Sequence, residues 1–154
     1  MQEYKVRYEK ETAEEVLSRI GAEKKDTVEQ EDLYLLSDSQ DIYRLVKKED
    51  EISLVHFRKK ETGFGMDMSK LLDTKASRAL FNLFENKSSI VRKVRTRYFW
   101  KGSKLAIDVI QPLGEFLEIY PKDDEAKKVI FEKFDITKEQ LITKSYYDLL
   151  KEYE

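Results

Sequence analysis

The chain has 154 residues, of which 40% are hydrophobic and 12% aromatic, enough for one domain with its own core. Its 29 basic residues nearly balance 31 acidic ones, which argues against a general nucleic-acid binder, and the absence of cysteine excludes disulfides and thiolate metal sites. No run of about 18 apolar residues and no signal-peptide pattern occurs. We therefore expect a single cytoplasmic domain over residues 1–154 that binds neither nucleic acid nor membrane.

Charged residues make up 39% of the chain, against about 25% in an average globular protein. A heavily solvated surface, as in many thermophile proteins, explains this excess. A cavity lined by charge explains it as well. Composition alone favours the solvated surface. The position of the charges along the chain has to decide between a solvated surface and a charged cavity.

The first nine residues alternate, with Tyr4, Val6 and Tyr8 on one side and charged residues on the other, which predicts a strand. Thr12 and Glu15 have the spacing of a capping box, and apolar residues follow at helical spacing over residues 13–20. The chain therefore predicts a strand followed by a helix.

Residues 27–36 look extended, and residues 42–47 and 52–60 predict a hairpin. A short strand near residues 66–68 and a helix beginning at Asp73 or Thr74 follow. Residues 90–100, 105–110 and 116–120 predict three further strands. Helices are expected near Asp123 and from Thr137, where Gln140 completes a second capping box and Leu141 and Ile142 supply apolar positions. These elements, about seven strands and four helices joined by short turns, predict an α+β fold with an antiparallel sheet.

Several predicted strands carry charge at alternating positions. The strand cations are Lys5, Arg7, Lys93, Arg95 and Arg97, and the strand acids are Glu3, Asp108 and Glu118. Each charged face alone is best explained as solvated. Taken together, they predict a closed antiparallel β-barrel with charge inside and helices packed outside. Because unpaired buried charge costs about several kcal/mol, such an interior favours a polyphosphate, with Mg²⁺ or Mn²⁺ between its oxygens and the carboxylates.

Four segments resemble motifs of one known family. Residues 90–120, IVRKVRTRYFWKGSKLAIDVIQPLGEFLEIY, are similar to its basic strand, its aspartate strand and its Leu-Gly-x-Phe-x-Glu segment. Residues 3–5 are similar to the end of its E-x-E-x-K motif, residues 30–34 (QEDLY) to its Q-x-D-x-Y segment, and residues 145–150 (SYYDLL) to its C-terminal segment. In order and spacing the chain resembles the CYTH family, the triphosphate tunnel metalloenzymes, which includes class IV adenylate cyclases and thiamine triphosphatases.

The resemblance implies a set of site residues. The implied metal ligands are Glu3, Asp108 and Glu118, for Mg²⁺ or Mn²⁺. The implied phosphate-binding residues are Lys5, Arg44, Arg58, Lys93 and Arg95. Arg58 is chosen by its spacing and by alternation from Ile52 and Leu54, with Lys60 as the substitute. Lys5 is also a candidate for activating water, because burial among cations lowers a lysine pKa.

The chain departs from the family pattern in four places. Met1 and Tyr120 stand where the family has glutamates, and Val46 stands where it has a second arginine. Of the R-x-E-x-E strand that the family has after Lys60, only Asp67 is left. The remaining acids suit one metal better than two, since Mg²⁺ usually takes one or two carboxylates. His56, the only histidine, could face the interior by alternation, although a lone strand histidine is more often structural.

The resemblance implies three functions. The favoured one is a metal-dependent hydrolase of triphosphates, either inorganic triphosphate or a nucleoside or thiamine triphosphate. The alternatives are a class IV adenylate cyclase, which converts ATP to cyclic AMP and pyrophosphate, and a polyphosphate- or nucleotide-binding module with a degenerate metal site. The partner is a small molecule in every case, and a homodimer remains open because family members are often dimers.

Overall fold

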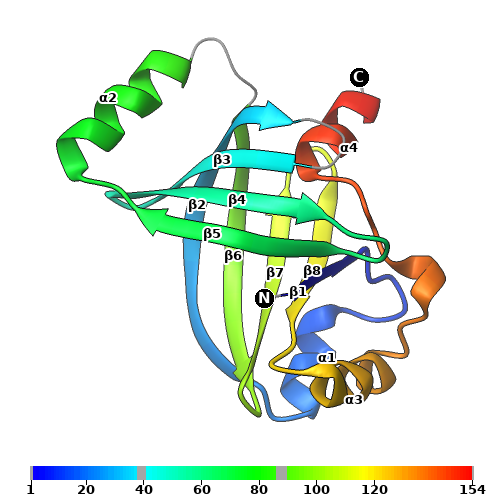
Figure 1. Ribbon diagram of the computed structural model, residues 1–154. Helices are drawn as coiled ribbons and strands as arrows, with labels where there is room; N and C mark the ends of the chain where they lie inside the picture. The colour runs from blue at the N-terminus through cyan, green and yellow to red at the C-terminus, as the bar shows by residue number, and fades with distance from the viewer. Residues whose placement is uncertain (1, 38–40, 86–89, 154) are drawn as a thin grey trace.

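The computed structural model describes residues 2–37, 41–85 and 90–153 (Figure 1). Within these residues eight strands close into a barrel in the order β1-β5-β4-β3-β2-β6-β7-β8, and every neighbouring pair is antiparallel. The strands are β1 Gln2–Val6, β2 Glu23–Ser37, β3 Asp41–Lys48, β4 Glu51–Lys59, β5 Phe64–Leu71, β6 Ile90–Trp100, β7 Ser103–Ile110 and β8 Gly114–Tyr120. The prediction of a closed antiparallel barrel with helices outside is confirmed.

The helices lie on different sides of this barrel (Figure 1). They are α1 Ala13–Arg19, α2 Thr74–Glu85, α3 Asp124–Phe134 and α4 Tyr146–Tyr153, with a 3₁₀ turn at Lys138–Gln140. The expected caps are present: Thr12 Oγ1 accepts from the Glu15 N–H at 3.2 Å, and Asp123 Oδ1 accepts from the Ala126 N–H at 2.7 Å. In the described part of the chain, no helix is long and apolar enough to cross a membrane.

The largest core cluster lies outside the barrel wall, between β1, β6, β7 and β8 and the paired helices α1 and α3. Tyr4 and Val6 belong to this cluster, and Tyr8 packs against it. Because successive side chains of a strand point to opposite faces, burying Tyr4 and Val6 under the helices directs Glu3 and Lys5 into the barrel. The apolar pattern of the first strand thus determines which charges become interior.

A second outer cluster lies beneath α2. It contains Leu33, Leu45, Ile52 and Phe81, with Leu54 packed against it. The helix therefore covers the outer faces of β2, β3 and β4. This packing assigns Ile52 and Leu54 to the outside of the barrel.

The prediction of a helix from Thr137 is wrong. The capping box forms, with the Thr137 N–H donating to Gln140 Oε1 at 2.9 Å, but it encloses only the 3₁₀ turn. The chain then runs extended along β1, where the Ile142 N–H donates to the Lys5 carbonyl at 2.8 Å and Leu141 bridges Val6. Pairing with the barrel wall replaces helical hydrogen bonds, so α4 begins only at Tyr146.

Candidate functional site

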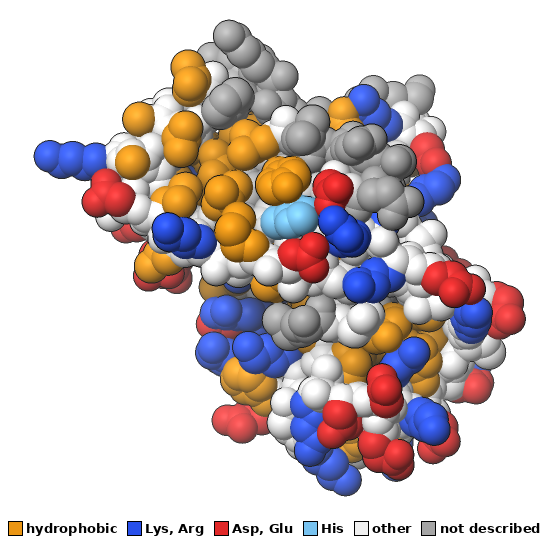
Figure 2. All heavy atoms as spheres, viewed as in Figure 1, with side chains coloured by type: hydrophobic (Ala, Val, Ile, Leu, Met, Phe, Trp, Pro, Cys, Tyr) orange, Lys and Arg blue, Asp and Glu red, His pale blue; other side chains and the backbone are white. Residues whose placement is uncertain are grey.

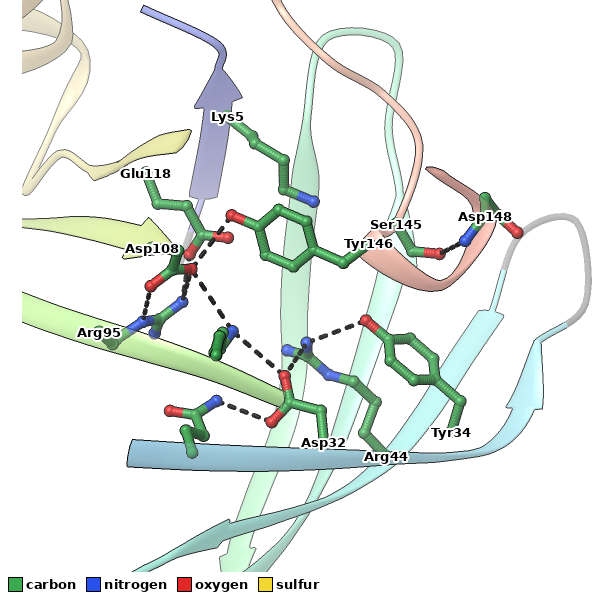
Figure 3. Close-up of polar contacts among 12 residues, drawn as sticks. Lys5, Asp32, Tyr34, Arg44, Arg95, Asp108, Glu118, Ser145, Tyr146 and Asp148 are labelled. Carbon is green, nitrogen blue, oxygen red and sulfur yellow. Dashed lines mark hydrogen bonds and ion pairs between the residues drawn. The ribbon is translucent and has the colours of Figure 1, made fainter. Parts of the chain in front are cut away.

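The interior of the barrel brings together most of the residues selected from the sequence (Figure 3). β1 supplies Glu3 and Lys5, β3 supplies Arg44, β6 supplies Lys93 and Arg95, β7 supplies Asp108, and β8 supplies Glu118. Glu3, Lys5, Lys93, Asp108 and Glu118 are buried, while the Arg44 and Arg95 side chains keep 13% and 12% exposure. Five strands thus place four cations and three carboxylates within one bore.

Arg95 organises one side of the interior. Its Nε and Nη2 donate to the two oxygens of Asp108, each at 2.7 Å, and Nη2 also donates to Glu118 Oε2 at 2.6 Å. Bidentate pairs of this kind hold arginine in one orientation. Burial by itself would raise the pKa of Glu118, but the charge of Arg95, followed by those of Lys93 and Lys5, outweighs burial and holds this pKa well below its usual range. Glu118 is therefore ionised at neutral pH.

Asp32 organises the neighbouring part of the barrel wall, and the sequence did not identify it as a site residue. Its carboxylate is fully buried and accepts from Gln30 Nε2 at 2.7 Å and from Arg44 Nη1 at 3.1 Å. The Lys93 ammonium lies 3.2 Å from the same carboxylate. Asp32 thus joins β2, β3 and β6 and positions two of the proposed phosphate-binding cations. The QEDLY segment was the only sequence signal for it.

Glu3 differs from the other interior acids because one of its oxygens has no partner. Oε2 is buried without a hydrogen bond to any described residue. Burial and the neighbouring charge of Glu118 raise the pKa of Glu3 to about 7. Burial lowers the pKa of Lys5, whose Nζ donates to the Lys144 carbonyl at 3.2 Å. The centre therefore has a carboxylate oxygen available to a ligand.

Helix α4 closes one end of the bore with aromatic side chains. The Tyr146 hydroxyl donates to Asp108 Oδ2 at 3.1 Å, and its ring lies 3.9 Å from the Lys5 Nζ (Figure 3). Tyr147 stacks on Tyr34 with ring centroids 5.4 Å apart. From the sequence, Tyr146 is most simply interpreted as a residue that packs in the core or against a helix. The structure buries it and also makes it a hydrogen-bonding member of the site, through the closing SYYDLL segment.

The other end of the bore is open. A cavity of about 520 Å³ begins at Arg44 and Arg95 and reaches the β3–β4 turn and the start of β2. Its outer part is lined by Lys48 and Arg97, and Arg97 forms an ion pair with Asp26. Arg7, another of the alternating cations, is exposed and donates to the Leu113 carbonyl at 2.8 Å. Arg44 and Arg95 are therefore accessible to a ligand that enters this cavity.

Arg58 does not join the site, so the prediction that it faces the interior is wrong. Its side chain is 54% exposed and lies 3.4 Å from Asp41 and 3.8 Å from Asp67 on the outer surface. His56 lies on the same face, 2.8 Å from Asp41, with its ring stacked on Tyr43. Figure 2 shows the histidine at the surface between acidic and basic side chains, beside a group of hydrophobic ones.

The register of β4 explains the error. Alternation was counted from Ile52 and Leu54 as interior positions, but both pack beneath α2. Val55 is the cross-strand partner of Arg44 and faces the cavity, so the odd-numbered positions of β4 point inward. The inward cation on this strand is Lys59, which donates to Asp148 of α4 at 3.0 Å. The substitute, Lys60, is exposed.

The interior acids are suited to hold one hard cation, although they do not form a group of three ligands around a common point. Among residues 2–37, 41–85 and 90–153, no three His, Cys, Asp or Glu side chains gather as a metal site. Asp108 is occupied by Arg95 and Tyr146, whereas Glu3 keeps a free oxygen close to Glu118. Two carboxylates with phosphate oxygens and water satisfy Mg²⁺ or Mn²⁺. Met1, which stands where the family motif has its first glutamate, lies outside the described residues.

Tyr120 stands at the place where the family motif has its last glutamate. Its hydroxyl donates to Glu118 Oε2, the same oxygen that Arg95 contacts. Burial raises the pKa of Tyr120, so the phenol stays a neutral donor. The position therefore supplies a hydrogen bond to Glu118 and no additional negative charge.

Fold and site together define a β-barrel protein with a charged binding tunnel, closed at one end by a helix. The chain belongs to the CYTH family, since the CYTH domain profile matches residues 1–146. A comparison with curated proteins finds no match.

Solved structures with the same fold come from archaea and bacteria. A protein of Pyrococcus horikoshii OT3 superposes with a TM-score of 0.77 at 21% identity, over 97% of this chain and 99% of that one. A protein of Pyrococcus furiosus gives 0.75 at 18% identity, over 96% and 98%. A Bacillus halodurans protein, named as a candidate adenylate cyclase, gives 0.67 at 16% identity, over 93% and 92%. At these identities the likeness concerns the fold.

Proposed function

We propose that this protein is a metal-dependent triphosphatase that hydrolyses a phosphoanhydride bond of a triphosphate held in the tunnel. The observation that carries the proposal is a buried donor without an acceptor: Arg44 Nε has no hydrogen-bond partner among the described residues. An unsatisfied buried donor costs about 1–3 kcal/mol, and a ligand rich in oxygen removes this cost. Arg44 lines the cavity together with Arg95, and guanidinium groups are well suited to binding phosphate oxygens.

The proposed roles follow from where each side chain lies. Arg44 and Arg95 bind phosphate oxygens from the cavity wall, and the buried Lys5 and Lys93 add positive charge within the bore. Phosphoryl transfer needs this positioning and charge neutralisation more than covalent help. Lys5 is the proposed proton acceptor for the attacking water, because burial lowers the pKa of its amine.

Glu3 and Glu118, with Asp108 behind them, are the residues that would hold the metal. When bound, the metal would neutralise phosphate charge and lower the pKa of a water molecule. Asp108 would bind the metal only if Arg95 released it, because both Asp108 oxygens accept hydrogen bonds from the Arg95 side chain. Until then Asp108 orients Arg95 for the phosphate.

A product assay tests the reaction class. We expect the protein, incubated with tripolyphosphate or ATP and Mn²⁺, to release inorganic phosphate. Cyclic AMP with pyrophosphate from ATP would show a cyclase instead. Unchanged ligand with measurable binding would show a binding module whose metal site is degenerate. The last two outcomes contradict the proposal and each identifies its replacement.

Tripolyphosphate should raise the melting temperature of the metal-free protein. At a ligand concentration of about 100 times Kd, linkage adds about 2.7 kcal/mol, which is a shift of roughly 5–10 °C for a chain of this size. We expect Arg58→Met to keep this shift and Arg44→Met to lose most of it, each measured against its own ligand-free protein by scanning fluorimetry. No shift of the wild type at millimolar ligand would contradict tunnel binding altogether.

A further inference from the structure

Lys48 continues the inward face of β3 beyond the residues assigned above. Arg44, Val46 and Lys48 alternate on one side of the strand, and Lys48 pairs in register with Gln30 of β2, which is buried in the bore. The Lys48 side chain is half-buried and lines the open cavity. Four residues of strand, roughly 13 Å, separate it from Arg44 in the direction of the mouth.

No carboxylate neutralises Lys48. In the described part of the chain its Nζ has no ion pair within 4.0 Å, although Glu49 and Glu51 also line the cavity. Asp32, an interior acid whose charge acts on Lys48, already contacts Arg44 and Lys93, and Asp26, which also interacts with Lys48, is paired with Arg97.

The charged groups that act on Lys48 are mostly cations. Burial comes first and lowers the pKa of Lys48 to about 8, followed by the charges of Arg95, Arg97 and Lys93. Asp32 opposes this shift but does not cancel it. A half-buried cation among cations, at the wall of an open cavity, is an arrangement that an anionic ligand completes.

We propose that Lys48 forms an outer anion subsite that takes the fourth phosphate of a linear polyphosphate, in line with three phosphates held deeper in the bore. This inference rests on the proposed function. The side chains that flank Lys48 on β2 and β3 are Val28, Gln30 and Val46. The aromatic rings of this cavity, Phe57, Tyr98, Phe99 and Tyr120, belong to β4, β6 and β8. A chain of phosphates satisfies both the inner arginines and the outer lysine with a single kind of group. The substrate class is therefore linear polyphosphate longer than triphosphate.

The test compares two chain lengths on matched variants. Lys48→Met removes the charge and keeps the length of the side chain. Lys47→Met is the control, because Lys47 is the next residue and its Nζ lies 5.2 Å from the Phe81 ring beneath α2, on the opposite face. Binding of tripolyphosphate and tetrapolyphosphate to the full chain is measured by titration calorimetry in metal-free buffer.

We expect the wild type to bind tetrapolyphosphate about tenfold more tightly than tripolyphosphate, the size of one charge-assisted contact. Lys48→Met should remove this preference, whereas Lys47→Met should keep it. Equal binding of the two ligands by the wild type, or an equal loss for both in Lys48→Met, overturns the inference while tunnel binding stands. If neither ligand binds the wild type, the proposed function fails together with the inference.

Stability provides an independent prediction for the same variant. Because charged Lys48 lacks a counter-charge in the free protein, we expect Lys48→Met to raise the ligand-free melting temperature at pH 7. The folded pKa of about 8 lies below the unfolded value of 10.5, so the cost of the charge is complete below pH 8 and disappears as pH rises to 10.5. The gain in melting temperature should therefore shrink over that range. A lower melting temperature than wild type would show that Lys48 has an anionic partner and would overturn the subsite.

Discussion

Asp32→Asn is expected to destabilise the free protein by about 3–5 kcal/mol, the usual effect of removing one partner from a buried ion pair. Arg44 and Lys93 both lie close to this fully buried carboxylate, so the substitution leaves two cations in the bore with reduced compensation. For a chain of this length, the melting temperature should fall by roughly 10 °C. Thermal or denaturant unfolding measures the change.

Adding tripolyphosphate to Asp32→Asn tests whether the lost stability comes from uncompensated cations in the bore. Tripolyphosphate brings negative charge to the same cations, so it should recover part of the stability lost in Asp32→Asn. Glu31→Gln is the matched control, because Glu31 is the neighbouring residue on the other face of β2 and pairs in register with Arg92. A melting temperature of Asp32→Asn equal to that of Glu31→Gln would refute the organising role of Asp32.

Acid should reduce the difference between the wild type and Asp32→Asn. Burial alone would raise the pKa of Asp32, but the charges of Lys93 and Arg44 outweigh it and lower this pKa below the usual range. A depressed carboxylate pKa stabilises the fold above the unfolded value and loses this contribution as pH falls through the folded one. The two proteins should therefore become more alike in stability as the solution is acidified.

Glu118→Gln should lower metal-dependent turnover of tripolyphosphate by about a hundredfold to a thousandfold, the effect of losing one preorganised electrostatic group. Its carboxylate lies beside Glu3 and accepts from Arg95, so the substitution removes a proposed metal ligand and also changes the environment of a phosphate-binding arginine. The fold should survive, because Arg95 keeps both hydrogen bonds to Asp108. Phosphate release at saturating Mn²⁺ and the far-ultraviolet circular dichroism spectrum measure the two effects.

Glu115→Gln is the control for this substitution. Glu115 lies on the same strand, three residues before Glu118, and is exposed. Its loss should leave turnover within about twofold, as expected for a surface position away from the site. If Glu118→Gln retains the turnover of Glu115→Gln, Glu118 does not belong to the catalytic centre.

Alternation along single strands was the most informative signal in the sequence. The apolar side of β1 has to be buried, and this requirement alone directs Glu3 and Lys5 away from the outer cluster. The same argument places Lys93 and Arg95 on one side of β6, together with the acids of β7 and β8. Local capping at Thr12 and Asp123 was also readable, because a helix start depends on a few neighbouring residues.

The sequence could not determine which side of β4 faces inward. Both sides carry apolar residues, with Ile52 and Leu54 on one and Val55 and Phe57 on the other. Helix α2 packs over Ile52 and Leu54, so this side of β4 faces outward. The contact joins segments that are separated in the chain. Arg58 consequently lies outside and Lys59 inside.

By itself, the sequence determined the closed antiparallel barrel, the charged faces of its strands and most of the interior acids and bases, because alternation and capping depend on near neighbours. Only the tertiary structure decided that Asp32 joins Arg44 to Lys93, that residues after the 3₁₀ turn pair with β1, and that Tyr146 closes the bore beside Asp108. Each of these contacts joins parts of the chain brought together by barrel closure, and a pattern within one segment carries no information about them.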